Sequence, residues 1–121
     1  MPRRRSSAQP ERSSARNPPA ARDLTREPPR PMDARSGGYA WLPRMTDKAR
    51  ASRAGTLGPF IYPCPIDRAC LGRLRIDPDT FADIAEGAPD DAAVLASLEA
   101  FGAAPPDQEF DPVALEEELN A

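Results

Sequence analysis

Four charged residues at helical spacing are the first candidates for chemistry in this sequence. They are Arg44, Asp47, Lys48 and Arg50. Residues three or four positions apart lie on the same side of a helix, so all four side chains project from one side of the predicted helix. Arginine offers carboxylates and phosphates a two-pronged donor, and lysine adds a second positive charge. The pattern predicts an anion-binding site for a small anionic ligand.

The same pattern also fits an ordinary solvated helix face. Asp47 and Arg50 would then form an exposed ion pair that contributes about 0.3 kcal/mol. If a site exists, the change Lys48→Ala should remove anion binding and alter the stability by less than about 0.5 kcal/mol. The sequence leaves both interpretations open.

Cys64 is a second candidate, as a reactive thiol. It lies three residues before Asp67, where a helix is expected to begin. The partly positive end of a helix favours the thiolate, which is the nucleophilic form of cysteine. The neighbouring Pro65 and Ile66 favour a buried corner instead, in which the cysteine only fills space. Cys70 shares a helical face with two leucines, so we expect it in the core.

Composition excludes several reaction types. The chain has no His, which rules out a histidine-dependent triad or a histidine general base. Its two cysteines cannot fill a tetrahedral zinc site, and no glycine-rich phosphate loop is present. We therefore expect no metal site and no cofactor. No nucleophile–base pair stands out, and we assign no catalytic residue.

The distribution of charge and of apolar residues bears on location and partners. Residues 1–53 carry a net charge of +8 and residues 54–121 a net charge of −11. The Arg-, Ser- and Pro-rich tail at 1–22 is expected to be disordered, either as a solvated tail or an over-extended start, or, alternatively, as an arm that binds nucleic acid weakly and in a salt-dependent manner. No run approaches the roughly 20 apolar residues of a membrane-spanning helix, and no secretory signal is visible. We expect no membrane association and a cytoplasmic protein with free thiols.

Aspartates that can cap helices recur along the second half of the chain. Three of them follow a large apolar residue and precede another by four positions, which is the hydrophobic staple around a helix N-cap. These are Asp67, Asp77 and Asp111, and Asp90 is a fourth cap without the full staple. They predict helices at 68–74, 78–86 and 112–119, and a further helix that ends at Phe101 with that residue facing inward.

An amphipathic helix is also expected earlier, from about residues 39–42 to a stop at Gly55. Pro43 fits only in its first turn. The proline-interrupted segment 56–65 is expected to be a structured loop with at most a short extended pair. These elements predict an all-α fold, a small domain of four or five short helices. The expected parts are the tail 1–22, an extended Pro-rich lead-in 23–36, a helical core domain 37–102, and a linker with an acidic amphipathic helix at 103–121.

Two motifs of the chain also occur together in a known family. One runs from Gly37-Gly38-Tyr39 through Asp47-Lys48-Ala49-Arg50-Ala51 to Gly55, and the other is Cys64-Pro65-Ile66-Asp67. They resemble the bacterial family called domain of unknown function 5069, over about residues 23–101. The resemblance implies a small, stand-alone, cytoplasmic bacterial protein with no assigned chemistry. The chain departs from the family at Pro59-Phe60-Ile61, where such proteins typically have Glu-Tyr, often followed by His.

The leading hypothesis is a non-catalytic binding or protein-interaction module, whose partner is a protein or a small anionic ligand. The first alternative is a small-molecule enzyme that uses Arg44, Asp47, Lys48 and Cys64. The second is non-specific nucleic-acid association through the basic tail. The sequence identifies neither the ligand nor the partner.

Overall fold

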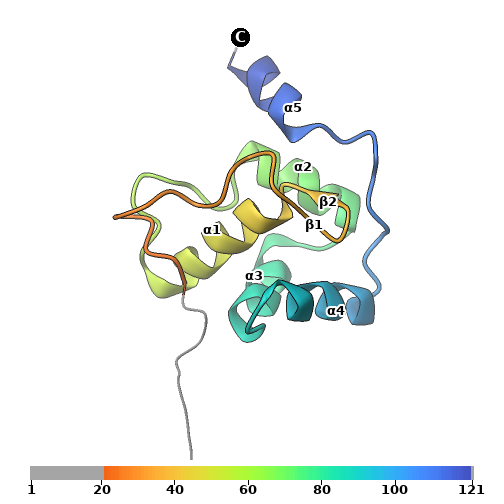
Figure 1. Ribbon diagram of the computed structural model, residues 1–121, viewed down its shortest axis with the longest axis horizontal. Coiled ribbons are helices and arrows are strands. Elements are labelled where there is room, and N and C mark those ends of the chain that lie inside the picture. Colours follow the sequence, from red (N-terminus) through yellow and green to blue (C-terminus); the bar gives the residue numbers. More distant parts are fainter. Residues whose placement is uncertain (1–20, 121) are drawn as a thin grey trace, which may run out of the picture.

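The computed structural model describes residues 21–120, so nearly all of the expected N-terminal tail lies outside the described residues. The described chain forms five helices and one antiparallel pair of two-residue strands (Figure 1). The elements are β1 (Arg35–Ser36), β2 (Tyr39–Ala40), α1 (Leu42–Ala54), α2 (Pro65–Leu74), α3 (Pro78–Gly87), α4 (Asp91–Phe101) and α5 (Pro112–Leu119). The predicted all-α fold of short helices is therefore confirmed.

Three of the four predicted aspartate caps are confirmed. The side chains of Asp77, Asp90 and Asp111 each accept a hydrogen bond from the backbone N–H three residues further on. Proline stands at the start of α3 and α5, where its fixed φ suits the first helical turn. These contacts satisfy N–H groups that have no partner inside the helix.

The prediction of a fourth aspartate cap, at Asp67, is wrong. Helix α2 begins three residues earlier than predicted, and its N-cap is Cys64. The sulfur of Cys64 accepts the Asp67 N–H at 3.5 Å, and the Asp67 carboxylate accepts the Cys64 N–H at 2.9 Å. This reciprocal pair is a capping box, with Asp67 in the first turn of the helix rather than before it.

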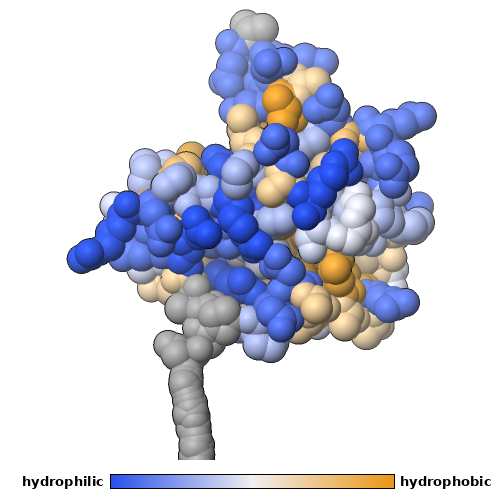
Figure 2. Space-filling model, in the orientation of Figure 1, coloured by the Kyte–Doolittle hydropathy of each residue, from blue (hydrophilic) through white to orange (hydrophobic). Residues whose placement is uncertain are grey.

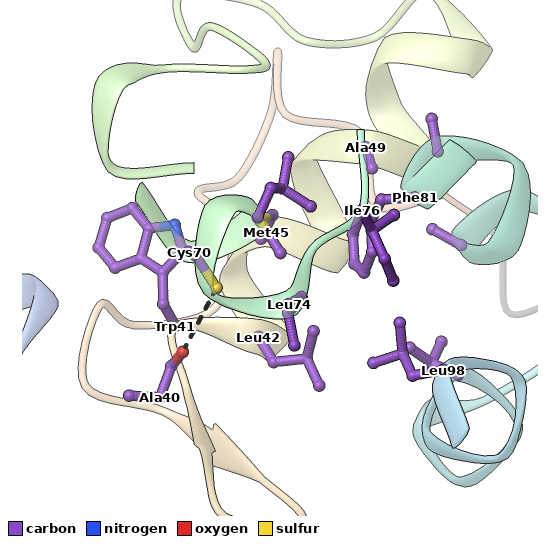
Figure 3. Close-up of a cluster of buried hydrophobic side chains, with 14 of the residues drawn as sticks. Ala40, Trp41, Leu42, Met45, Ala49, Cys70, Leu74, Ile76, Phe81 and Leu98 are labelled. Atoms are coloured by element: carbon purple, nitrogen blue, oxygen red, sulfur yellow. Dashed lines mark hydrogen bonds between the residues drawn. The ribbon is translucent and has the colours of Figure 1, made fainter. Parts of the chain in front are cut away.

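The core lies where α1 packs on α3, with α2 and α4 alongside (Figure 1). Figure 3 shows Met45 and Ala49 of α1 in this cluster with Phe81 of α3, and all three are fully buried. Leu98 enters the cluster from α4. The expectation that Phe101 faces inward is wrong, because this residue in the last turn of α4 is 53% exposed. The chain turns directly after it, and the Ala104 N–H donates to the carbonyl of Leu74 at the end of α2.

The segment before β1 packs against the helices. Leu24 is buried, and its N–H donates to the carbonyl of Thr56 at 2.9 Å. Asp23 accepts the Thr25 N–H and holds a turn, so the segment is not extended throughout as predicted. The loop 56–64 between α1 and α2 forms no strand, and the short strand pair instead flanks Gly37 and Gly38, both at positive φ. Positive φ at both central residues is the requirement of the type I′ turn, one of the two common turns of two-residue hairpins.

Gly58 fixes the loop 56–64 against the N-terminal segment. It has a φ of +59°, and a Cβ at this position would lie 2.7 Å from the backbone oxygen of Leu24. We expect Gly58→Ala to lower the free energy of unfolding by about 1–3 kcal/mol, because the new methyl group meets strained backbone and a carbonyl that cannot move freely. Chemical denaturation measures this loss. Gly72→Ala is the control, since a Cβ there meets nothing within 4 Å, and an equal effect of the two changes would contradict the prediction.

Candidate functional site

The four charged residues of α1 do not form one exposed surface. Asp47 and Lys48 are 5% and 3% exposed, and Arg44 and Arg50 are half-buried. Each of the four is bound to a partner outside α1. The interpretation of these residues as a solvated helix face is therefore wrong, because other segments of the chain cover this side of the helix.

Asp47 pairs with Arg30 rather than with Arg50. The Arg30 side chain donates to both Asp47 oxygens, at 3.0 and 3.1 Å, and its backbone N–H donates at 2.9 Å. The same guanidinium donates to both oxygens of Asp91 at the start of α4. Arg30 thus joins the N-terminal segment, α1 and α4. This geometry holds the fold together and removes Asp47 from any exposed anion site.

Arg50 also has a structural position. Its guanidinium donates to the carbonyls of Ala85 and Ala88 at 2.9 and 3.0 Å. These two carbonyls lie at the C-terminal end of α3, where backbone acceptors lack helical partners. Burial lowers the pKa of Arg50, although the nearby Asp47 partly opposes the shift. A cation bound to a helix end in this way is not available to a ligand.

Lys48 belongs to a buried polar cluster with Cys64 and Asp67. Its Nζ lies 2.8 Å from Asp67 Oδ2 and 3.2 Å from Cys64 Sγ. The other Asp67 oxygen accepts the indole N–H of Trp41 at 2.7 Å. Asp67 is fully buried, and the two donor side chains and the capping-box N–H satisfy its carboxylate. The cluster connects the start of α1 with the start of α2.

Trp41 stands in an unusual backbone conformation at this junction. It is the N-cap of α1 with a φ of +76°, in the left-handed region, and it is 2% exposed. A bulky residue rarely adopts this conformation, and such strain gathers at functional sites. The indole is thereby turned under the cluster, where it forms the floor of a pocket.

The pocket has a volume of about 470 Å³ and is open to solvent. Its walls come from the start of α1, the loop 56–64, the start of α2 and the end of α5. Arg44, Lys48 and Cys64 all line it, so the structure brings together three of the five predicted site residues. Asp47 and Arg50 are not among its lining residues. Sequence alone could not make this division, because the partners of Asp47 and Arg50 are distant in the chain.

Arg44 lines this pocket and has a hydrogen-bond donor that no described residue accepts. Its guanidinium carbon lies 5.5 Å from the ring centre of Trp41 and 5.6 Å from that of Phe60. One terminal nitrogen donates to the Arg30 carbonyl at 3.1 Å. The Nε atom is buried and has no hydrogen-bond partner within residues 21–120. Two aromatic rings and one backbone carbonyl therefore hold the side chain in place, while an N–H remains unsatisfied.

Apolar side chains form the mouth of the pocket. Ile61 of the loop and Leu119 of α5 line it and are 66% and 55% exposed. Figure 2 shows apolar surface among the charged residues of α5. Glu116 adds a carboxylate to the α5 wall. The pocket therefore combines two cationic side chains and one carboxylate with an apolar rim.

Sequence reasoning missed Trp41, Phe60 and Asp67 as members of this site. Trp41 is the single tryptophan of the chain and lies at the predicted start of a helix, which was a usable signal. Asp67 was predicted to be a helix N-cap, and only its position in the Cys-Pro-Ile-Asp motif indicated a role beyond capping. Phe60 gave no signal, since the loop that carries it has no regular pattern.

Fold and site define a small helical protein with a pocket lined by cations and a thiol. The family model described as Domain of unknown function (DUF5069) matches residues 26–116, and the chain belongs to this family. The match extends from the N-terminal segment into α5, further toward the C-terminus than the motifs alone indicate. No curated protein matches the chain.

Metal binding and membrane insertion are two further properties to consider for the described residues. Within residues 21–120, no group of three or more His, Cys, Asp or Glu side chains is arranged to hold a metal ion. In the same part of the chain, no helix has the length and apolar character needed to cross a bilayer.

Proposed function

We propose that this protein is a non-catalytic binding module for a small organic anion, held by Arg44 in the pocket above Trp41. The observation that carries the proposal is the buried, unpartnered Nε of Arg44, a residue whose side chain lines the pocket. A buried donor without a partner is costly, at about 1–3 kcal/mol. A carboxylate or phosphate that accepts from Nε and the neighbouring terminal nitrogen would remove this cost and match the planar donor pair.

The pocket also supports an organic rather than an inorganic anion. The rings of Trp41 and Phe60 lie next to the Arg44 cation, and Ile61 adds an apolar side chain to the lining. Small-molecule sites commonly combine apolar walls with a few fixed polar groups. A ligand with one anionic end and an apolar body uses both parts of this pocket.

The enzyme alternative is weaker because two of its four residues are bound elsewhere. Asp47 is paired with Arg30, and Lys48 is paired with the buried Asp67. Of the four residues, only Arg44 and Cys64 would remain for a reaction in the pocket. The free thiols of Cys64 and Cys70 are consistent with a reducing compartment such as the cytoplasm.

Benzoate, with benzamide as its neutral counterpart, tests the proposed function. We expect benzoate to raise the melting temperature and benzamide to leave it unchanged, since only the anion pairs with Arg44. A ligand at 100 times its dissociation constant adds about 2.7 kcal/mol of stability. Differential scanning fluorimetry and isothermal titration calorimetry measure the effect.

Arg44→Gln provides the decisive variant, and Arg68→Gln on the exposed face of α2 is the matched control. We expect the first change to abolish the benzoate effect and the second to preserve it. No response of the unmodified protein to benzoate, or a response that survives Arg44→Gln, would contradict the proposal.

Protein interaction stays the second candidate function, favoured by Ile61 and Leu119. Both are large, exposed apolar side chains at one rim of the pocket. Clustered apolar surface of this kind marks contact sites more often than single exposed residues do.

Association of the N-terminal tail with nucleic acid concerns residues outside the described part and stays a prediction, to be tested by the salt dependence of binding.

A further inference from the structure

The two thiols of the chain have opposite environments. Cys70 is 3% exposed, its sulfur lies 4.0 Å from the Ala40 carbonyl (Figure 3), and burial raises its pKa to about 12. Cys64 is half-buried and lines the pocket. Cys64 is therefore the thiol that a small reagent in the pocket can reach.

Two donors converge on the sulfur of Cys64. The Lys48 ammonium lies 3.2 Å away, and the Asp67 N–H in the first turn of α2 lies 3.5 Å away. Donors aimed at sulfur stabilise negative charge on it, and the positive end of α2 acts in the same direction. The nearest negative charge, on Asp67, is already bound by Lys48 and Trp41. The sulfur of Cys64 is therefore held by two hydrogen-bond donors at the wall of the pocket.

Arg44 and Cys64 face the same small volume. The Arg44 and Lys48 cations both lie over the Trp41 ring, at 5.5 and 5.8 Å from its centre. Lys48 in turn contacts the Cys64 sulfur. An anion bound by Arg44 therefore brings the atoms next to its charged group toward this thiol.

We propose that Cys64 is a covalent modification site for small α,β-unsaturated carboxylates, with Arg44 as the residue that positions the carboxylate. The inference rests on the proposed anion site. In the reaction, the thiolate forms a carbon–sulfur bond to the β-carbon, and the electron pair of the carbon–carbon double bond moves to the α-carbon. The α-carbon then takes a proton from water, which replaces the proton that the thiol released. No oxidant or leaving group is needed.

Two pairs of matched reagents test the proposal on the intact protein. Acrylate and acrylamide share a reactive carbon–carbon double bond, but only acrylate is charged. Iodoacetate and iodoacetamide share a displaceable iodide, but only iodoacetate is charged. Mass spectrometry gives the rate of modification at each cysteine. We expect the anionic-to-neutral rate ratio at Cys64 to exceed the ratio for the urea-unfolded chain by about tenfold, which corresponds to about 1.4 kcal/mol.

Variants separate positioning by Arg44 from simple thiol reactivity. Arg44→Gln should return the rate ratio at Cys64 to that of the unfolded chain while the neutral reagents react as before. Arg68→Gln should leave the ratio unchanged. Cys64→Ser should remove the adduct, and serine can replace the cysteine as helix N-cap, so this variant is expected to fold.

The outcomes distinguish this proposal from the proposed function. If benzoate binds but Cys64 is inert to all four reagents, covalent modification is overturned and anion binding stands. If Cys64 reacts without preference for the anions and benzoate does not bind, both proposals are overturned. A charge preference that persists in Arg44→Gln would overturn the role assigned to Arg44.

Discussion

Replacing Lys48 with methionine is expected to lower the free energy of unfolding by about 3–5 kcal/mol, the cost of removing one partner of a buried ion pair. Lys48 is 3% exposed and lies 2.8 Å from Asp67 Oδ2. Methionine fills similar volume but leaves the fully buried Asp67 carboxylate without its cation. Chemical denaturation followed by circular dichroism measures the loss.

A double-mutant cycle shows whether the pair itself is responsible. Lys48→Met combined with Asp67→Leu removes both charges, so the double variant should lose less stability than the sum of the single changes. Arg68→Met on the exposed face of α2 is the control and should change the stability by less than about 0.5 kcal/mol. A loss of that small size for Lys48→Met would place the lysine at the surface, as the helical spacing alone predicted.

Replacing Arg30 with methionine is expected to cost about 2–4 kcal/mol near neutral pH. Its guanidinium binds Asp47, whose side chain is 6% exposed, and Asp91, whose side chain is 39% exposed. The loss arises mainly at Asp47, because water reaches Asp91 and compensates for its missing partner. We expect this loss to be smaller than that at Lys48, because the Arg30 side chain is 27% exposed and water partly replaces it.

The effect of Arg30→Met should depend on pH in a defined direction. The hydrogen bond from Arg30 lowers the pKa of Asp91, so this carboxyl binds its proton less readily in the folded than in the unfolded chain. The stability that this shift provides is present above the unfolded pKa and is lost as the pH falls through the folded pKa. The difference between wild type and variant should shrink in acid, as denaturation curves at a series of pH values would show. A difference that grows on acidification would contradict the assignment.

Local signals in the sequence predicted much of the fold. The caps at Asp77, Asp90 and Asp111 involve only a side chain and an N–H three residues on, so spacing was enough to find them. The cap of α2 was misplaced because aspartate is a preferred cap and cysteine is not. Here a thiol takes the capping position, and Asp67 is engaged by side chains from α1.

The site was less predictable because its contacts join distant segments. Spacing on α1 identified Arg44 and Lys48 correctly as residues of one side of the helix, but it does not reveal what packs on that side. The partner of Asp47 is 17 residues away and one partner of Arg50 is 38 residues away. Such pairings depend on how the helices cross and how the loop 56–64 folds, which no local pattern encodes.

The position of the single tryptophan gives this protein an internal optical reporter. Trp41 forms the pocket floor, with its N–H bound to Asp67 and two cations over its ring. Indole emission responds to nearby charge and to solvent. A ligand bound above the ring and unfolding of the chain therefore both change the fluorescence of Trp41. A ligand titration and a denaturation curve can therefore both be followed by this fluorescence in unlabelled protein.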